Sequence, residues 1–347
     1  MIRATTLLAA DPSATMVRKT SDQHPPDDDP PDGPDEGPDE GRDAPAIAEA
    51  ALTIPATDGF ALAATCVRPE APVRARVLIG PATGVLRRYY AAFARALAAR
   101  GFEVLTIDYR GVGDSAPPRL RGFEARMYDW GARDLAGGLR WIFGRAPALP
   151  ALFVGHSIAG QLLPAAEGAE RLAAILLVGA QGGNLDVFTG RDRVLVGLFW
   201  RVVVPATTGL LGRLPGWAMG GGEDLPASVA RDWARWGLHP GGVLGEHPDL
   251  RERAARITAP TALISFEDDF HAPRSSVDVL ASWYGPAGAT RCHIHPRDVG
   301  ARKIGHFGGF RPAFRDTLWA RATQWLEGHA HSPGAAAPRD ASTEVLP

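Results

Sequence analysis

Cysteine and lysine are scarce in this 347-residue chain, and the scarcity of cysteine excludes two classes of protein. The only cysteines, Cys66 and Cys292, lie in different halves of the chain, so they form neither a disulfide framework nor a cysteine metal site. A reducing compartment is therefore expected, and with it a cytoplasmic location. Lysine occurs only at positions 19 and 303, a bias that we interpret as codon usage without functional meaning.

The chain also lacks a strong charge of one sign. Its formal net charge is −2, which divides into −7 over residues 1–45 and +5 over the remainder. Neither value indicates a nucleic-acid partner. With 45% hydrophobic and 22% charged residues, the composition is that of a globular protein with a full core, in one large or two small domains.

Large apolar residues are absent from residues 21–45, which contain ten acidic residues and seven prolines. Such a segment cannot bury enough surface to offset its ordering entropy, so residues 1–45 are expected to form a disordered acidic tail. Residues 329–347 are rich in Ala, Pro and Ser and are expected to be flexible. The folded body is predicted at 46–328.

Long hydrophobic runs are missing except for one, Val194–Gly212. Arg201 and Pro205 interrupt this run, and it lies between predicted sheet elements. We therefore expect a buried or cap helix here and no integral membrane span.

The body alternates short apolar runs with segments of helical spacing, which predicts an α/β fold whose parallel sheet is covered on both faces. Ligands of such sheets bind at the carboxyl ends of the strands. The predicted strands are 47–54 and 60–68, which form a hairpin, then 76–80, 102–107, 151–154, 173–178, 261–266 and 290–295. The predicted helices are 89–100, 128–143, 158–167, 275–284 and 313–326.

The segment Gly155-His156-Ser157 joins a predicted strand directly to a predicted helix. A serine on such a sharp turn projects its hydroxyl above the sheet, where the next N–H group and the helix N-terminus can stabilise an oxyanion. Gly-x-Ser also occurs at Gly113–Ser115, but two prolines follow it and no helix can begin there. The context therefore selects Ser157 as the candidate nucleophile.

This segment resembles the nucleophile elbow of the α/β-hydrolase superfamily, with Ala159 in place of the last glycine of its G-x-S-x-G pattern. Over about 46–328 the chain is most similar to bacterial hydrolases related to serine aminopeptidases and monoacylglycerol lipases. The resemblance implies a mostly parallel eight-stranded sheet with helices on both faces. It also implies that the insertion at about 181–257 is a helical cap.

The resemblance further implies a Ser-His-Asp triad, because a serine needs a base and the base needs a carboxylate. Its base is expected at His306, in a glycine-rich loop before the last helix. Its acid is expected at Asp269, four residues before Pro273, with Asp268 as the alternative. A zinc site of His293, His295 and His306 lacks the spacing of known sites, so neither a metal nor a cofactor is expected.

Oxyanion donors are expected from two backbone segments. One is the Ile158 N–H group. The resemblance implies a second donor in the loop after the strand 76–80, which would be Ala82 or Thr83 since Pro81 has no N–H. The segment Asp108–Ser115 resembles the D-x-R-G-x-G-x-S turn of the superfamily, and we interpret it as structural.

These observations predict a serine hydrolase that acts on carboxylic esters through an acyl-enzyme, with a small-molecule ester or acyl substrate. An acyltransferase or thioesterase with the same triad is the first alternative, and a catalytically silent binding protein is the second. The cap contains Trp200, Trp217, Trp233 and Trp236. They indicate either an apolar acyl or alcohol group or a core of the cap itself. The oligomeric state stays open.

Overall fold

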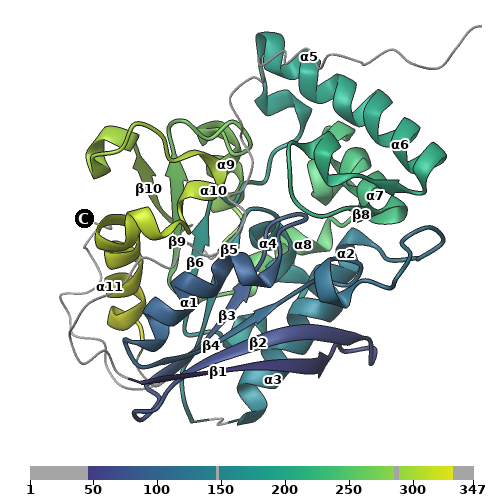
Figure 1. Ribbon diagram of the computed structural model, residues 1–347. Helices are drawn as coiled ribbons and strands as arrows, with labels where there is room; N and C mark the ends of the chain where they lie inside the picture. The colour runs from purple at the N-terminus through teal and green to yellow at the C-terminus, as the bar shows by residue number, and fades with distance from the viewer. Residues whose placement is uncertain (1–45, 146–147, 285–288, 331–347) are drawn as a thin grey trace, which may run out of the picture.

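The computed structural model describes residues 46–145, 148–284 and 289–330. The predictions for the acidic tail 1–45 and for the C-terminal tail beyond residue 330 lie outside these residues. The described residues form a sheet with helices on both faces and a helical cap on one side (Figure 1).

The sheet has eight strands in the order β1-β2-β4-β3-β5-β6-β9-β10, as the resemblance implies. Strands β1 and β2 form the predicted hairpin, and β2 is also antiparallel to β4; the other neighbours are parallel. The bounds are β1 Ile47–Pro55, β2 Ala61–Pro69, β3 Ala75–Gly80, β4 Phe102–Ile107, β5 Ala151–His156, β6 Ala174–Val178, β9 Thr261–Phe266 and β10 Thr290–Ile294.

Helices cover both faces of the sheet because its central strands are apolar on both sides. One face carries α1 (Ala91–Ala98) and α11 (Ala320–Gly328), which follow the turns η1 (Arg87–Tyr90) and η12 (Arg315–Trp319). The other face carries α3 (Ala136–Arg145), α4 (Ile158–Leu162) and α9 (Arg274–Ala281). Helix α2 (Met127–Asp129) and the π-turn η3 (Trp130–Leu135) lead directly into α3.

The helix predicted over 158–167 is shorter than expected. It ends as α4 at Leu162 and continues only as the 3-10 turn Leu163–Ala165. Pro164 explains the difference, since its ring removes an N–H donor and clashes with the preceding turn. The helix predicted over 89–100 begins in a 3-10 turn, and those predicted over 128–143 and 313–326 contain π segments. The helix predicted over 275–284 ends at Ala281.

The cap lies between β6 and β9 and contains one long helix of 22 residues, Gly190–Leu211. This helix consists of α5 (Gly190–Leu198), the π-turn η7 (Phe199–Val203) and α6 (Val204–Leu211). The π-turn directly precedes α6, and Pro205 lies at the N-terminal end of α6. Proline is tolerated at such a position because it has no N–H group to pair. The remaining cap elements are β7 (Arg213–Leu214), η8 (Gly216–Met219), β8 (Leu225–Pro226), α7 (Ala227–Leu238) and α8 (Asp249–Arg256).

Three of the four cap tryptophans pack inside the cap. Trp200 and Trp236 are buried, and the Trp233 ring lies 6.4 Å from that of Trp200. Trp217 on η8 is exposed. The aromatic content of the cap is thus largely its own core, and these three tryptophans give no direct support to an apolar substrate.

Candidate active site

Ser157 lies at the junction of β5 and α4 with φ 53° and ψ −117°. It is the only non-glycine residue with positive φ among those the structure describes. This conformation costs a residue with a Cβ atom on the order of 1–3 kcal/mol, and such strain clusters at functional sites. The junction therefore has the backbone geometry of the predicted elbow.

Ala159 fits this elbow because its neighbour on β3 is a glycine. A Cβ atom at Gly80 would lie 2.9 Å from the Ala159 methyl group and 2.7 Å from the Phe153 ring. A Cβ atom at Gly160 would lie 2.7 Å from the Ala180 methyl group. The helix thus approaches the sheet closely at Gly80 and Gly160, and the departure from the G-x-S-x-G pattern is accommodated locally.

Asp269 and His306 form a buried pair at the carboxyl end of β9. The two Asp269 carboxylate oxygens lie 3.0 and 2.8 Å from His306 Nδ1, so that nitrogen carries the proton and donates it. One carboxylate oxygen also accepts the N–H groups of His271 and Ala272. Burial would raise the pKa of Asp269, but His306 and these N–H donors together hold it below its ordinary value.

Asp268 binds the backbone of the segment that carries His306. Its Oδ2 accepts the N–H groups of Ile304 at 2.8 Å and Gly305 at 3.1 Å, and it makes no contact with the His306 ring. These are the first N–H groups of helix α10 (Gly305–Gly308). His306 therefore lies in a short helix capped by Asp268, where a loop was expected, and the geometry favours Asp269 as its carboxylate partner.

Ser157 and the Asp269–His306 pair converge at the end of β6. The Ser157 N–H donates to the Val178 carbonyl at 3.1 Å. A Cβ atom on the next residue, Gly179, would lie 3.3 Å from both His306 Nδ1 and Asp269 Oδ2. The Ser157 hydroxyl makes no hydrogen bond among the described residues, so its link to His306 stays a prediction. Such bonds are often loose without substrate.

Tyr90 and His156 form a buried hydrogen-bonded chain that the sequence did not reveal. The Tyr90 hydroxyl accepts the Ala82 N–H at 2.9 Å and lies 2.9 Å from His156 Nδ1. His156 Nε2 lies 3.1 Å from the His306 carbonyl oxygen. Because a carbonyl only accepts, Nε2 carries the proton and Nδ1 accepts from Tyr90.

The chain from Ala82 to His306 positions the segment that carries His306. His156 holds the His306 carbonyl, and the Tyr89 hydroxyl donates to the next carbonyl, that of Phe307. With the two N–H groups held by Asp268, each of four consecutive residues of this segment has one backbone group bound by a side chain. This arrangement limits movement of the His306 ring relative to the sheet.

His156 should make the stability of the protein depend on pH. Burial lowers its pKa to about 3, against about 6.5 in the unfolded chain. The unfolded state then binds one more proton between these values, so the contribution is complete above about pH 6.5 and is lost as pH falls toward 3.

Replacing His156 by Gln should remove this dependence. The difference in unfolding free energy between the native protein and His156→Gln should shrink by about 2 kcal/mol between about pH 7 and pH 5. Urea unfolding at the two pH values measures it, and groups that titrate alike in both proteins cancel. Parallel pH profiles would show that His156 is not held neutral.

The structure also separates the two oxyanion candidates on the loop after β3. The Ala82 N–H is engaged by Tyr90, which leaves Thr83 as the remaining candidate on this loop. Ile158 is the first residue of α4, and the first N–H groups of a helix have no partner within it. Ile158 and Thr83 therefore stay predictions, and Ala82 is disfavoured.

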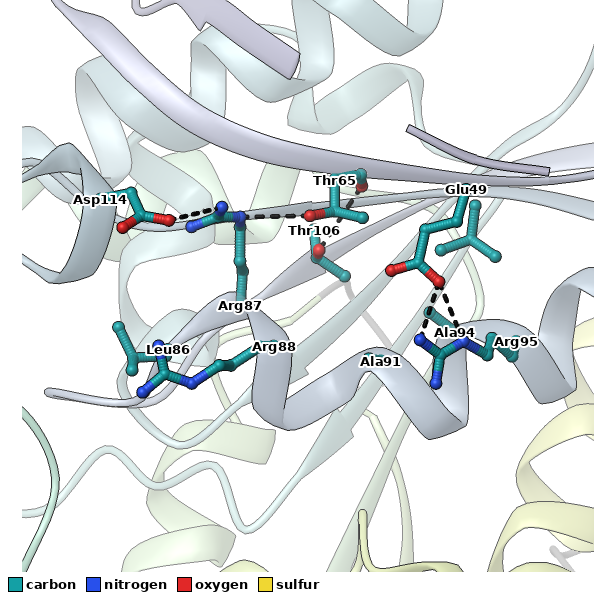
Figure 2. Close-up of a pocket in the computed structure, with 11 residues that line it drawn as sticks. Glu49, Thr65, Leu86, Arg87, Arg88, Ala91, Ala94, Arg95, Thr106 and Asp114 are labelled. Atoms are coloured by element: carbon teal, nitrogen blue, oxygen red, sulfur yellow. Dashed lines mark hydrogen bonds and ion pairs between the residues drawn. The ribbon is translucent and has the colours of Figure 1, made fainter. Parts of the chain in front are cut away.

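The Asp108–Ser115 turn is held by internal polar contacts. Arg87 makes ion pairs with Asp108 and Asp114 and donates to Thr65, as the close-up in Figure 2 shows for Thr65 and Asp114. The Ser115 hydroxyl accepts the Ala63 N–H and donates to the Asp108 carbonyl.

A pocket of about 170 Å³ opens beside this turn, lined from β1, β2, β4, η1, α1 and Asp114. None of the candidate site residues lines it. The contacts of the turn agree with its interpretation as structural, and the pocket is separate from the candidate active site.

The three histidines of the rejected zinc site have other partners. His293 contacts Ser265 and Glu267, His295 caps the turn at Arg297, and His306 faces Asp269. Within residues 46–145, 148–284 and 289–330, no group of three or more His, Cys, Asp or Glu side chains is arranged to hold a metal ion.

Comparisons with known proteins give one family match and several structural neighbours. The family model described as serine aminopeptidase, S33, matches residues 71–182. A hypothetical protein from Pseudomonas aeruginosa aligns with 82% of this chain and 94% of its own, at a TM-score of 0.57 and 15% identity. No curated protein matches significantly.

Two further solved structures are esterases. One is a thermophilic esterase from Thermogutta terrifontis, with TM-score 0.51, 17% identity, and 81% of this chain and 100% of that chain covered. The other is an acetyl xylan esterase from Paenibacillus sp. R4, with TM-score 0.52, 18% identity, and coverage of 83% and 86%. At these identities the likeness establishes the fold.

Proposed function

We propose that this chain is a serine hydrolase of the α/β-hydrolase superfamily that cleaves carboxylic esters with an apolar acyl or alcohol group. The observation that supports the proposal most is the buried Asp269–His306 pair, which lies beside the strained turn at Ser157. The structural likeness to esterases agrees with it.

The proposed reaction begins with attack of the Ser157 hydroxyl oxygen on the ester carbonyl carbon. His306 Nε2 accepts the hydroxyl proton, and Asp269 stabilises the imidazolium through the proton on Nδ1. His306 then donates the proton to the departing alcohol, which leaves an acyl group on Ser157. Water, deprotonated by His306, releases the acid and regenerates the serine.

The negative charge that develops on the carbonyl oxygen is proposed to meet the N–H groups of Ile158 and Thr83. Loss of one such donor typically costs about 3–4 kcal/mol in the transition state. The first turn of α4 adds the positive end of its peptide dipoles.

The proposed preference for an apolar group rests on the ring pair Phe188–Phe270. Their centroids lie 5.8 Å apart, and Phe270 directly follows Asp269 in the chain. Phe270 is partly exposed although its neighbour is buried. An acyl chain that contacts these rings would be removed from water. Each methylene buried in this way contributes about 0.8 kcal/mol to the free energy of binding.

p-Nitrophenyl esters of rising chain length test this specificity. The kcat/KM for the butyrate should exceed that for the acetate by about tenfold, the effect of two buried methylenes. Phe270→Ser should lower this ratio several-fold while the acetate rate stays nearly unchanged. An unchanged ratio in the variant would locate the acyl chain elsewhere.

Product analysis in the presence of an added alcohol separates hydrolysis from acyl transfer. A hydrolase should release mainly free acid, whereas an acyltransferase should form the new ester in excess of its share by concentration. A chain that turns over none of the esters would favour the catalytically silent alternative.

A further inference from the structure

The long cap helix Gly190–Leu211 is apolar on the side that faces away from the protein. Its inner side is formed by Gly197, Trp200, Val204 and Thr208, which are buried at helical spacing. Its outer side exposes Val194 by 68%, Leu198 by 52% and Val202 by 53% of their surface. Leu195, Leu210 and Leu211 are exposed as well.

The sequence predicted a buried or cap helix here, and the structure has a cap helix with one exposed side. By length and composition the helix could cross a membrane. Only 28% of its most apolar stretch is buried inside the protein. Figure 1 shows α5 and α6 along the outer edge of the cap, on the far side from the sheet. A helix with apolar residues on all sides usually has a second apolar environment.

Arginines accompany the apolar outer side. Arg191 and Arg201 are exposed on the helix, and neither forms an ion pair with a carboxylate in the described part of the chain. Arg121 donates to the Leu210 carbonyl near the end of the helix, whereas Arg231 donates to the Thr208 hydroxyl on its inner side. The helix itself contains a single acidic residue, Asp192. The helix therefore carries a net positive charge, which complements an anionic surface.

We propose that this helix docks the protein, parallel to the surface, onto an anionic lipid bilayer. The outer Val and Leu side chains would enter the acyl boundary, and the arginine stems would extend toward the lipid phosphates. Trp217, which is 75% exposed six residues beyond the helix, is the residue type that favours the membrane interface.

The same features disfavour a second copy of the chain as the occupant. Two such helices that paired antiparallel along their full length would meet at their midpoints, at residues 200–201. The exposed Arg201, which has no carboxylate partner among the described residues, lies near this midpoint in each copy, and like charges close to an interface are unfavourable. Lipid phosphates remove this conflict.

The inner side of the same helix is linked to the candidate active site. The Phe188 ring lies 6.5 Å from Trp200 on the inner side of the helix and 5.8 Å from Phe270. Phe270 directly follows Asp269. Ring contacts therefore connect the inner side of the helix to the residue beside the proposed catalytic acid.

Flotation with vesicles tests the proposal. The full chain should float with vesicles of equal amounts of phosphatidylcholine and phosphatidylglycerol, and less with phosphatidylcholine alone. Combining Val194→Gln, Leu198→Gln and Val202→Gln should lower the bound fraction at low lipid concentration on the order of tenfold. Arg201→Gln should weaken binding about fivefold on the anionic vesicles only, in a salt-dependent manner.

Two controls separate docking from folding and from catalysis. Val279→Gln replaces an apolar side chain that is 40% exposed on α9, and it should leave binding unchanged. Ser157→Ala should also float like the native chain, so failure of the proposed chemistry would not affect this test. Hydrolysis of a short soluble ester should be unaffected by the three Gln substitutions.

Three results would overturn the proposal. Failure of the native chain to float with either vesicle would exclude docking. A dimer in sedimentation that the Gln substitutions dissociate, together with absent flotation, would identify a second copy as the occupant. Retention in the vesicles after an alkaline carbonate wash would show insertion across the bilayer.

Discussion

Ser157→Ala should lower ester hydrolysis by at least about 10⁴-fold, because the methyl side chain cannot form the acyl-enzyme. The residual rate would come from substrate binding and from the oxyanion donors alone. A fluorophosphonate probe should label the native chain once, at residue 157, and should leave the variant unlabelled. Alanine lacks only the hydroxyl oxygen, so the fold should be retained, and circular dichroism checks this.

Ser115→Ala is the matched control for this experiment, since Ser115 lies in the other Gly-x-Ser segment. Its hydroxyl joins Ala63 and Asp108, so its loss should reduce stability by about 1–2 kcal/mol while probe labelling persists. Labelling of Ser157→Ala at the native rate would contradict the elbow assignment.

Asp269→Asn should reduce turnover by about 10²–10⁴-fold with the fold intact. The amide cannot stabilise the imidazolium, and its NH₂ group can turn toward Nδ1 and impose the wrong tautomer on His306. KM should change much less than kcat, because the carboxylate acts through His306 and not on the bound ester. Turnover of one short-chain ester measures the effect.

Substitutions of Asp268 separate the two neighbouring carboxylates. Asp268→Asn keeps an oxygen that can accept from Ile304 and Gly305, so its activity should fall only slightly. Asp268→Ala removes that acceptor and should destabilise the chain by about 1–3 kcal/mol. A greater loss of turnover in Asp268→Asn than in Asp269→Asn would reverse the assignment.

The sheet was largely predictable because each parallel strand is a short apolar run between polar turns. Residues 102–107 and 261–266 were predicted with the bounds that the structure has. The helix predicted over 158–167 is too long, because its apolar residues keep helical spacing past Pro164 whereas the α-helix ends at Leu162. The first turn of α10 was missed because its glycines suggest a loop, whereas the cap from Asp268 supports a helix.

Only those residues of the candidate site that stand in a recognisable local sequence pattern could be predicted. Ser157 stands in a strand–turn–helix context, and Asp269 and His306 follow strands in the order of the superfamily. The contacts of Tyr90 with His156, and of His156 with His306, join residues 66 and 150 positions apart, and no periodicity encodes them. The exposure of the cap helix was equally hidden, since composition does not distinguish a buried side from an unpartnered one.

The positive φ at Ser157 makes the chain less stable than it would be with a glycine at this position. A glycine at this position would adopt the same backbone without strain, whereas serine and alanine would not. An inactive chain that carries Ser157→Gly could therefore tolerate more destabilising mutations elsewhere than the active one. With Ser157 as the proposed nucleophile, stability and catalysis therefore favour different residues at this position.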